Sequence, residues 1–301
     1  MVRKLSAVVA LVCVFMMAVG LGGYSPATEA STLSGEASTI DGRGIIHSSA
    51  TGPIIIDHTC TDLSKIPDYW LEEAKKLAFH YAHTSHGGQI VQGMSKLEQV
   101  DSTYSYYRFT AGSTPPSSLP CPAGDLCMYD GNPPETYITP DDYWKTSGGM
   151  DRTRDVADTG LFDYSMWSWC GQASSYSEAD IQQYIDAMVQ FETEYPSMRF
   201  ILMTGHTDGG SATLARNNAM IRQHAQDQGL VLFDFADIET YDPLGGGPYD
   251  NDGAGTCQWC QTFCTAHPAY CTDLPDNCSH SDSPPEAALF GNTVERVGQP
   301  R

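Results

Sequence analysis

Basic residues are scarce in this chain. Its 16 lysines and arginines face 37 aspartates and glutamates, which gives a formal net charge of −21 at pH 7. Such acidity disfavours nucleic acid and anionic membrane surfaces, so neither is an expected partner. After residue 21 the chain also lacks a long apolar run, so no membrane span is expected in the mature protein. No internal repeat is present, so the sequence gives no sign of a repeat architecture.

The one long apolar run lies at the N-terminus and is typical of an export signal. Arg3 and Lys4 precede the run Leu5–Leu21, and small residues follow up to Ala30. Glycines break the end of the run, which favours cleavage over a retained anchor. Residues 1–30 are therefore predicted to be a signal peptide. The mature protein is expected to be secreted, periplasmic or at the cell surface.

An odd number of cysteines follows the predicted signal peptide. They are Cys60, Cys121, Cys127, Cys170, Cys257, Cys260, Cys264, Cys271 and Cys278. An exported compartment favours disulfides, and the odd count leaves one cysteine that is free, intermolecular or bound to a metal. Cys121 and Cys127 can close a small loop. The cysteines from Cys257 onward are dense enough for zinc but lack the usual two separated pairs, so disulfides are favoured there. A c-type haem is excluded because Gln261 stands where histidine is required.

The order of apolar and amphipathic segments predicts an α/β fold. Residues 31–52 are rich in Ser, Thr, Gly and Ala and are predicted to be a disordered leader. Strand and helix patterns alternate over residues 53–244, as expected for a mostly parallel sheet with helices on both faces. Residues 101–150, rich in Pro, Gly and Asp, are interpreted as a loop excursion over the site that contains one candidate strand, Tyr104–Phe109. Residues 245–301 are interpreted as a cysteine-rich C-terminal segment that completes the site. The clearest expected elements are the strands Leu77–Ala82, Phe162–Trp169, Met198–Met203 and Leu230–Phe235 and the helices Gly88–Val100, Ser177–Tyr195 and Thr213–Gln228.

Two of these strands end in polar turns that lead into helices. One turn contains His83, Thr84, Ser85 and His86, and the other follows Met203. Ligands of open α/β sheets bind at the carboxyl ends of the strands. A serine at such a turn is exposed, and backbone N–H groups at the helix start can stabilise an oxyanion. Ser85 is therefore a candidate nucleophile, with simple capping of the next helix as the alternative.

The order of these blocks resembles the SGNH (GDSL-type) hydrolase superfamily. The resemblance extends over roughly Lys75 to His280 and depends on Ser85 after the first main strand, Gly171 after a later one and Gly205-His206-Thr207-Asp208 after the next. Enzymes of this superfamily are mostly esterases and lipases. The resemblance implies a flavodoxin-like three-layer α/β/α sandwich and hydrolysis of an acyl ester without a cofactor. The implied substrate is a small-molecule or glycan ester.

The resemblance also implies a role for each matching residue. Ser85 is the implied nucleophile, His280 the general base and Asn277 the residue that orients this base. Oxyanion or substrate contacts are implied for Gly171, Thr207, His206, Asp208 and His86. The chain departs from the family pattern in having Thr207 where the oxyanion-binding asparagine belongs. Asn277 replaces the aspartate of the Asp-x-x-His block, and an amide orients a histidine without stabilising its cation as a carboxylate does.

Histidines near the same turns support an alternative of another class. His80 and His83 should face opposite sides of an extended strand, because side chains alternate there. The set able to converge on one ion is His83, His86, His206 and Asp208. Such nitrogen and oxygen donors suit zinc, while hydrogen bonding around the serine is the simpler interpretation. The alternative function is a non-catalytic exported binding protein of the same fold.

A glycan is the other ligand that such a binding protein could hold, on aromatic side chains. The candidate platforms, for which core packing is the favoured interpretation, are Tyr104, Tyr106, Tyr107, Tyr164, Trp167 and Trp169. A degenerate protein of purely structural role is the third possibility, because every motif block departs from the family pattern.

Overall fold

A computed structural model describes most of the predicted α/β region. The described residues are 38–40, 46–48, 52–61, 65–84, 86–207, 212–242, 244–249, 262 and 265–266. The predicted signal peptide and nearly all of the cysteine-rich segment lie outside them. The strands of the main sheet are β3 (Ile54–Ile56), β4 (Ala78–His83), β5 (Tyr106–Thr110), β6 (Leu126–Asp130), β7 (Tyr164–Ser168), β8 (Arg199–Met203) and β9 (Val231–Phe233). The helices are α2 (Asp68–Ala74), α3 (Gly87–Val100), α4 (Ser147–Ala157), α5 (Glu178–Glu194), α6 (Ala212–Gln228) and α7 (Phe235–Ile238).

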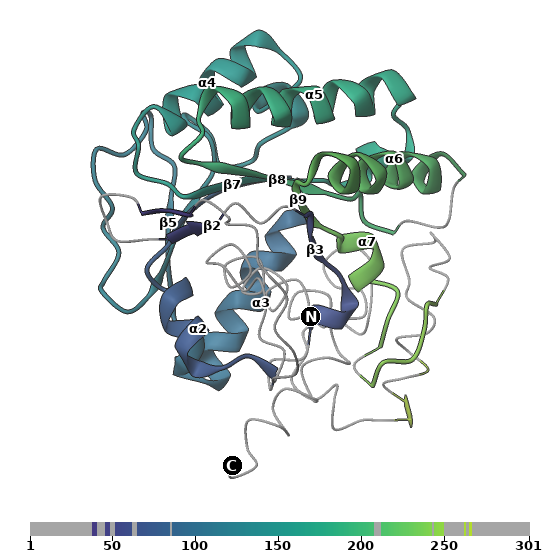
Figure 1. The fold of residues 1–301 in the computed structure, drawn as a ribbon, viewed down its shortest axis with the longest axis horizontal. Coiled ribbons are helices and arrows are strands. Elements are labelled where there is room, and N and C mark those ends of the chain that lie inside the picture. The colour runs from purple at the N-terminus through teal and green to yellow at the C-terminus, as the bar shows by residue number, and fades with distance from the viewer. Residues whose placement is uncertain are drawn as a thin grey trace, which may run out of the picture.

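The seven strands are all parallel, in the order β3-β9-β8-β7-β4-β6-β5. The inner five, β6-β4-β7-β8-β9, repeat the flavodoxin order 2-1-3-4-5 when numbered along the chain. Helices α4, α5 and α6 cover one face of the sheet, and α2 and α3 cover the other (Figure 1). The predicted three-layer α/β/α sandwich is confirmed. The strand order reverses between β4 and β7, which is the point where such folds bind ligands.

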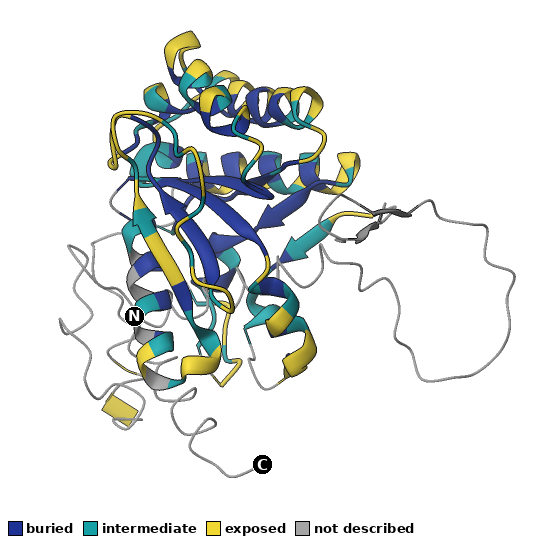
Figure 2. Cartoon of the chain, turned by 90° about the vertical axis from the view of Figure 1, so that its left-hand side faces the viewer, coloured by how far each residue is buried: buried dark blue, intermediate teal, exposed yellow. Residues whose placement is uncertain are grey.

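The inner strands are apolar because both faces of the sheet are covered. All five residues of β7 are buried, as are the first five of the six in β4. Figure 2 shows the inner strands as a dark blue layer, whereas the edge strands β3 and β5 are partly teal or yellow, and the other exposed residues lie mainly on the outer helix surfaces and loops. Helix α5 begins with a capping box between Ser177 and Asp180 and buries one face that includes Ile181, Tyr184 and Met188. Each such buried side chain contributes about 1.5–3 kcal/mol to folding.

Aromatic side chains fill the layer between the sheet and α5. Trp144, Trp167, Trp169 and Tyr184 are fully buried and meet mainly edge to face, with centroids 4.8 Å apart for Trp169 and Tyr184. The indole N–H of Trp167 donates to the Ile138 carbonyl, and that of Trp169 donates to the Met203 carbonyl. Core packing of Trp167 and Trp169 is therefore confirmed, and neither offers a platform for a glycan.

The segment 101–150, interpreted as a loop excursion, contributes two strands to the sheet: β5 overlaps the candidate strand Tyr104–Phe109, and β6 was not expected. Strand β6 is buried along its whole length and pairs with β4, while β5 lies outside β6. Positive-φ glycines at Gly124 and Gly131 flank β6, and the predicted disulfide Cys121–Cys127 ties the turn before β6 to the strand itself. A five-residue strand between such turn residues is too short to dominate the composition of the segment.

Six described residues of the predicted leader also pair. Strands β1 (Ser38–Ile40) and β2 (Ile46–Ser48) form an antiparallel pair, although the composition of residues 31–52 predicts disorder.

No helix in the described part of the chain combines the length and the apolarity needed to cross a bilayer.

Burial of His80 in the sheet predicts a pH-dependent stability. Its ring lies 2.9 Å from the Gly131 carbonyl and 2.8 Å from the Ser165 hydroxyl, and burial lowers its pKa from 6.5 to about 4. Between those pH values the unfolded chain binds a proton that the folded protein does not, so stability falls as the pH drops from 6.5 towards 4. The His80 contribution to this loss is about 3 kcal/mol.

We expect a His80→Gln variant to lose this part of the pH dependence. Urea unfolding at several pH values between 4 and 8 measures it for both proteins. The two stability curves should run parallel above pH 7 and converge as the pH falls. Equal slopes below pH 6.5 would show that His80 is protonated in the folded protein.

Candidate functional site

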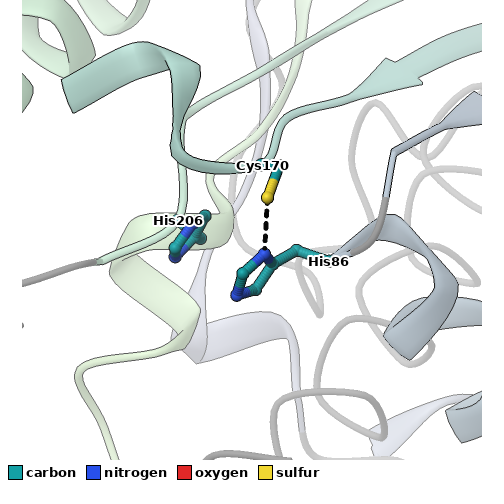
Figure 3. A group of neighbouring side chains, drawn as sticks. All are labelled: His86, Cys170 and His206. Carbon is teal, nitrogen blue, oxygen red and sulfur yellow. Dashed lines mark hydrogen bonds between the residues drawn. The ribbon is translucent and has the colours of Figure 1, made fainter. Parts of the chain in front are cut away.

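Three polar side chains follow three neighbouring strands at the point where the strand order reverses. His86 follows β4, Cys170 follows β7 and His206 follows β8. His86 Nδ1 lies 3.0 Å from Cys170 Sγ, and the His86 and His206 rings stack with centroids 3.7 Å apart and planes 13° from parallel. One ligand atom of each residue lies within 4.8 Å of the others. Figure 3 shows the three side chains converging at the ends of their strands. We call this group the His-Cys-His cluster.

Close packing at the start of α3 holds His86 against β7. A Cβ added at Gly87 would lie 2.2 Å from the His83 Cβ and 2.8 Å from the Ser168 Cβ, so only glycine fits there. The Tyr81 hydroxyl donates to the Gly87 carbonyl at 2.9 Å. The first turn of α3 therefore packs closely against the ends of β4 and β7.

A second glycine brings the turn after β8 close to the turn that carries Cys170. A Cβ at Gly205 would lie 2.3 Å from the Ala173 Cβ, in the 3₁₀ turn η5 (Gly171–Ser174) that follows Cys170. Asn218 of α6 accepts from the Gly205 N–H at 2.8 Å and donates to its carbonyl at 3.0 Å. The neighbouring Asn217 donates to the Ala173 carbonyl at 2.8 Å. Two adjacent side chains of α6 thus hold both turns.

Thr207 makes contacts that differ from its implied oxyanion role. Its backbone N–H and its hydroxyl donate to Glu239 Oε2 at 2.6 Å and 2.9 Å, and Glu239 is fully buried. A hydroxyl has one hydrogen, so this hydrogen is not directed at a substrate. Thr207 therefore positions the His206 turn. The same two hydrogen bonds hold the Glu239 side chain against that turn.

His83 does not join the cluster. Its Nδ1 lies 2.7 Å from the Thr84 carbonyl, and its Nε2 lies 3.1 Å from Asp130 Oδ1. Both ring nitrogens therefore face protein oxygens, and His83 is not among the described side chains whose ligand atoms gather in the cluster. Burial of Asp130 would raise the pKa of its carboxyl, but the bonds and charges of His83 and Arg108 hold it below its usual value. The predicted metal-binding set was His83, His86, His206 and Asp208. His83 does not belong to it.

The other implied residues divide into two groups. Gly171 is described and opens η5 directly after Cys170, at the carboxyl end of β7. The residues outside the described part of the chain are Ser85, Asp208, Asn277 and His280. The neighbours of Ser85 are described: Thr84 and His86 are both buried at the carboxyl end of β4.

Cys170 is a site residue that the sequence patterns did not single out, because an exported chain with many cysteines favours disulfides for each of them. Its place directly after a buried strand was the available signal.

Asp234 also follows a strand, β9. It forms a two-pronged ion pair with Arg222 at 2.5 and 2.7 Å and accepts from the Thr204 hydroxyl at 3.0 Å. These contacts give Asp234 a structural role.

A second group of titratable side chains lies beyond the ends of β3 and β9. His58 Nδ1 lies 2.5 Å from Asp237 Oδ2, Asp57 is near enough to share an ion, and the His58 ring stacks on Tyr241 with centroids 3.5 Å apart. Asp57, His58 and Asp237 are all only partly buried. This group is peripheral to the reversal between β4 and β7.

No family model, no curated protein and no solved structure matches this chain. Its class is therefore defined by its fold and by the cluster. It is a flavodoxin-like α/β protein with two imidazoles and a cysteine sulfur at the carboxyl edge of its sheet.

We predict that Asn218→Ala destabilises the protein by about 2–3 kcal/mol, because the buried N–H and carbonyl of Gly205 lose their partner. Urea unfolding at pH 7 measures the change. The matched control is Gln223→Ala on the same helix, where the side chain donates to Asp227 at the helix surface. This control should change stability by less than about 0.5 kcal/mol. Equal effects of the two substitutions would contradict the holding role of Asn218.

Proposed function

We propose that this protein is an exported hydrolase that cleaves acyl esters with Ser85 as its nucleophile. The observation that supports this most directly is the position of the chain on both sides of Ser85. Thr84 follows the central strand β4, and α3 begins at Gly87, at the reversal of strand order. A serine in this place meets ligands bound at the carboxyl edge and has helix-start N–H groups beside it.

The proposed reaction follows from these groups. The Ser85 hydroxyl attacks the ester carbonyl while the His280 imidazole, oriented by Asn277, takes its proton. The resulting oxyanion is stabilised by backbone N–H groups, those of Ser85 and Gly171 among them. Collapse releases the alcohol, which takes the proton from His280. Water then hydrolyses the acyl-enzyme by the same route and frees the acid.

The proposed substrate is a small-molecule or glycan ester, and the proposed place of action is outside the cytoplasm. The N-terminal apolar run supports export, and the disulfide Cys121–Cys127 is compatible with an oxidising compartment. His86 and His206 are buried at the same edge of the sheet and are proposed to line the substrate side.

A non-catalytic binding protein of the same fold is the second candidate. The observation that favours it is the His-Cys-His cluster, whose donors suit a metal ion. Trp167 and Trp169 are buried in the core and cannot stack on a sugar. Their burial argues against a glycan as the ligand of such a binding protein.

We expect Ser85→Ala to lower the turnover of a nitrophenyl acyl ester by at least about 10³-fold, because a hydrolase without its nucleophile keeps only binding and oxyanion stabilisation. A fluorophosphonate probe should add to the Ser85 peptide of the unaltered protein and not to the variant. Ser175→Ala, at a serine just after η5, is the matched control and should keep full turnover. Unchanged turnover in a folded Ser85→Ala variant would rule out the proposed nucleophile.

A further inference from the structure

The His-Cys-His cluster combines the donor types that zinc prefers. It offers two imidazole nitrogens and one sulfur, all within 4.8 Å of one another. With Zn–N bonds of about 2.0–2.1 Å and a Zn–S bond of about 2.3 Å, ligand atoms of a tetrahedral site lie about 3.3–3.6 Å apart. The 3.0 Å separation of His86 Nδ1 and Cys170 Sγ is shorter than this, and the nearly parallel rings of His86 and His206 have to turn for their in-plane lone pairs to meet at one ion.

We propose that His86, Cys170 and His206 bind one divalent zinc ion. The Cys170 thiol gives up its proton to solvent on binding, and the sulfur–zinc bond replaces its hydrogen bond with His86. The three ligands among the described residues leave a fourth position for water or for a substrate oxygen, and three protein ligands with an open fourth position are the pattern of catalytic rather than structural zinc. An ion there would lie at the reversal of strand order.

The surroundings of the cluster fix the ligands in place. His206 Nδ1 lies 3.1 Å from the Thr207 carbonyl, a contact that puts the ring hydrogen on Nδ1 and the lone pair on Nε2. Thr207 is in turn tied to the buried carboxylate of Glu239. Gly205 and Asn218 hold the same turn against the segment that follows Cys170.

The cysteine count is compatible with a metal-bound sulfur in this protein. Nine cysteines follow residue 30, and the pair Cys121–Cys127 leaves seven, an odd number. At least one cysteine therefore lies outside any intramolecular disulfide. Cys170 lies beside two imidazoles, where a metal ligand is expected. Zinc coordination would keep its sulfur from oxidation in an exported compartment.

Metal content and spectroscopy of the full exported protein test the proposal without any substrate. The protein is incubated with zinc, freed of excess and analysed for metal per chain. It is also loaded with Co²⁺, for which a bound thiolate gives sulfur-to-metal charge-transfer absorption. We expect one zinc per chain, a cobalt–thiolate band, and protection of Cys170 from alkylation by zinc. At 100 times its dissociation constant, zinc should raise the unfolding midpoint by about 5–10 °C.

The decisive variants are Cys170→Ser and His206→Gln, each of which should lower zinc affinity at least about 10-fold. Cys170→Ser should also abolish the cobalt–thiolate band. Two controls should keep both signals: Cys60→Ser, which alters a described cysteine outside the cluster, and His83→Gln, which alters the nearby histidine bound to Asp130. Circular dichroism confirms that each variant is folded.

Three results would overturn the proposal. One is the absence of stoichiometric zinc in the unaltered protein. Another is retention of zinc and of the cobalt–thiolate band in Cys170→Ser with loss of both in Cys260→Ser, which would put the metal in the cysteine-rich segment. The third is a disulfide at Cys170 in peptide maps of the unreduced protein. Failure of the serine mechanism is a separate outcome, because these measurements do not depend on ester turnover.

Discussion

The arrangement of the candidate site depends on parallel pairing of β7 with β4 on one side and with β8 on the other. Parallel strands end at the same edge of a sheet, so His86, Cys170 and His206 are brought together although they lie far apart in the sequence. The pairing alone leaves room for wide turns. Close approach at Gly87 and Gly205 removes that room, because neither position accommodates a Cβ without a shift of its neighbours.

Buried carboxylates around this edge are held in specific pairs. Asp130 lies between His83 and Arg108, Asp234 is held by Arg222, and Glu239 accepts from Thr207. Such pairs offset the cost of removing charge from water and restrict the turns to one arrangement. The His-Cys-His cluster differs from them because it gathers imidazole and sulfur donors suited to a metal.

The two proposals share one edge of the sheet but use different atoms. The proposed ester hydrolysis depends on Ser85 and on residues near the C-terminus, whereas the proposed zinc binding depends on the three described side chains. A zinc ion with an open position could polarise an ester carbonyl near Ser85, so the two functions are chemically compatible. They can also hold separately, since a bound metal is measurable in a protein without turnover.

The sequence by itself determined the fold class and the positions at which polar turns follow buried strands. Apolar strands and amphipathic helices such as Met198–Met203 and Thr213–Gln228 have periodicities that predict their structure locally, and β8 and α6 match them closely. Strand β6 was not predictable in this way, because its five buried residues, which include the disulfide-bonded Cys127 and end at a positive-φ glycine, have no clear period. The choice of partners was decided only by the tertiary structure. Cys170 meets His86, and His83 turns to Asp130, because strand order and close packing of the turns act between residues that the local sequence does not relate.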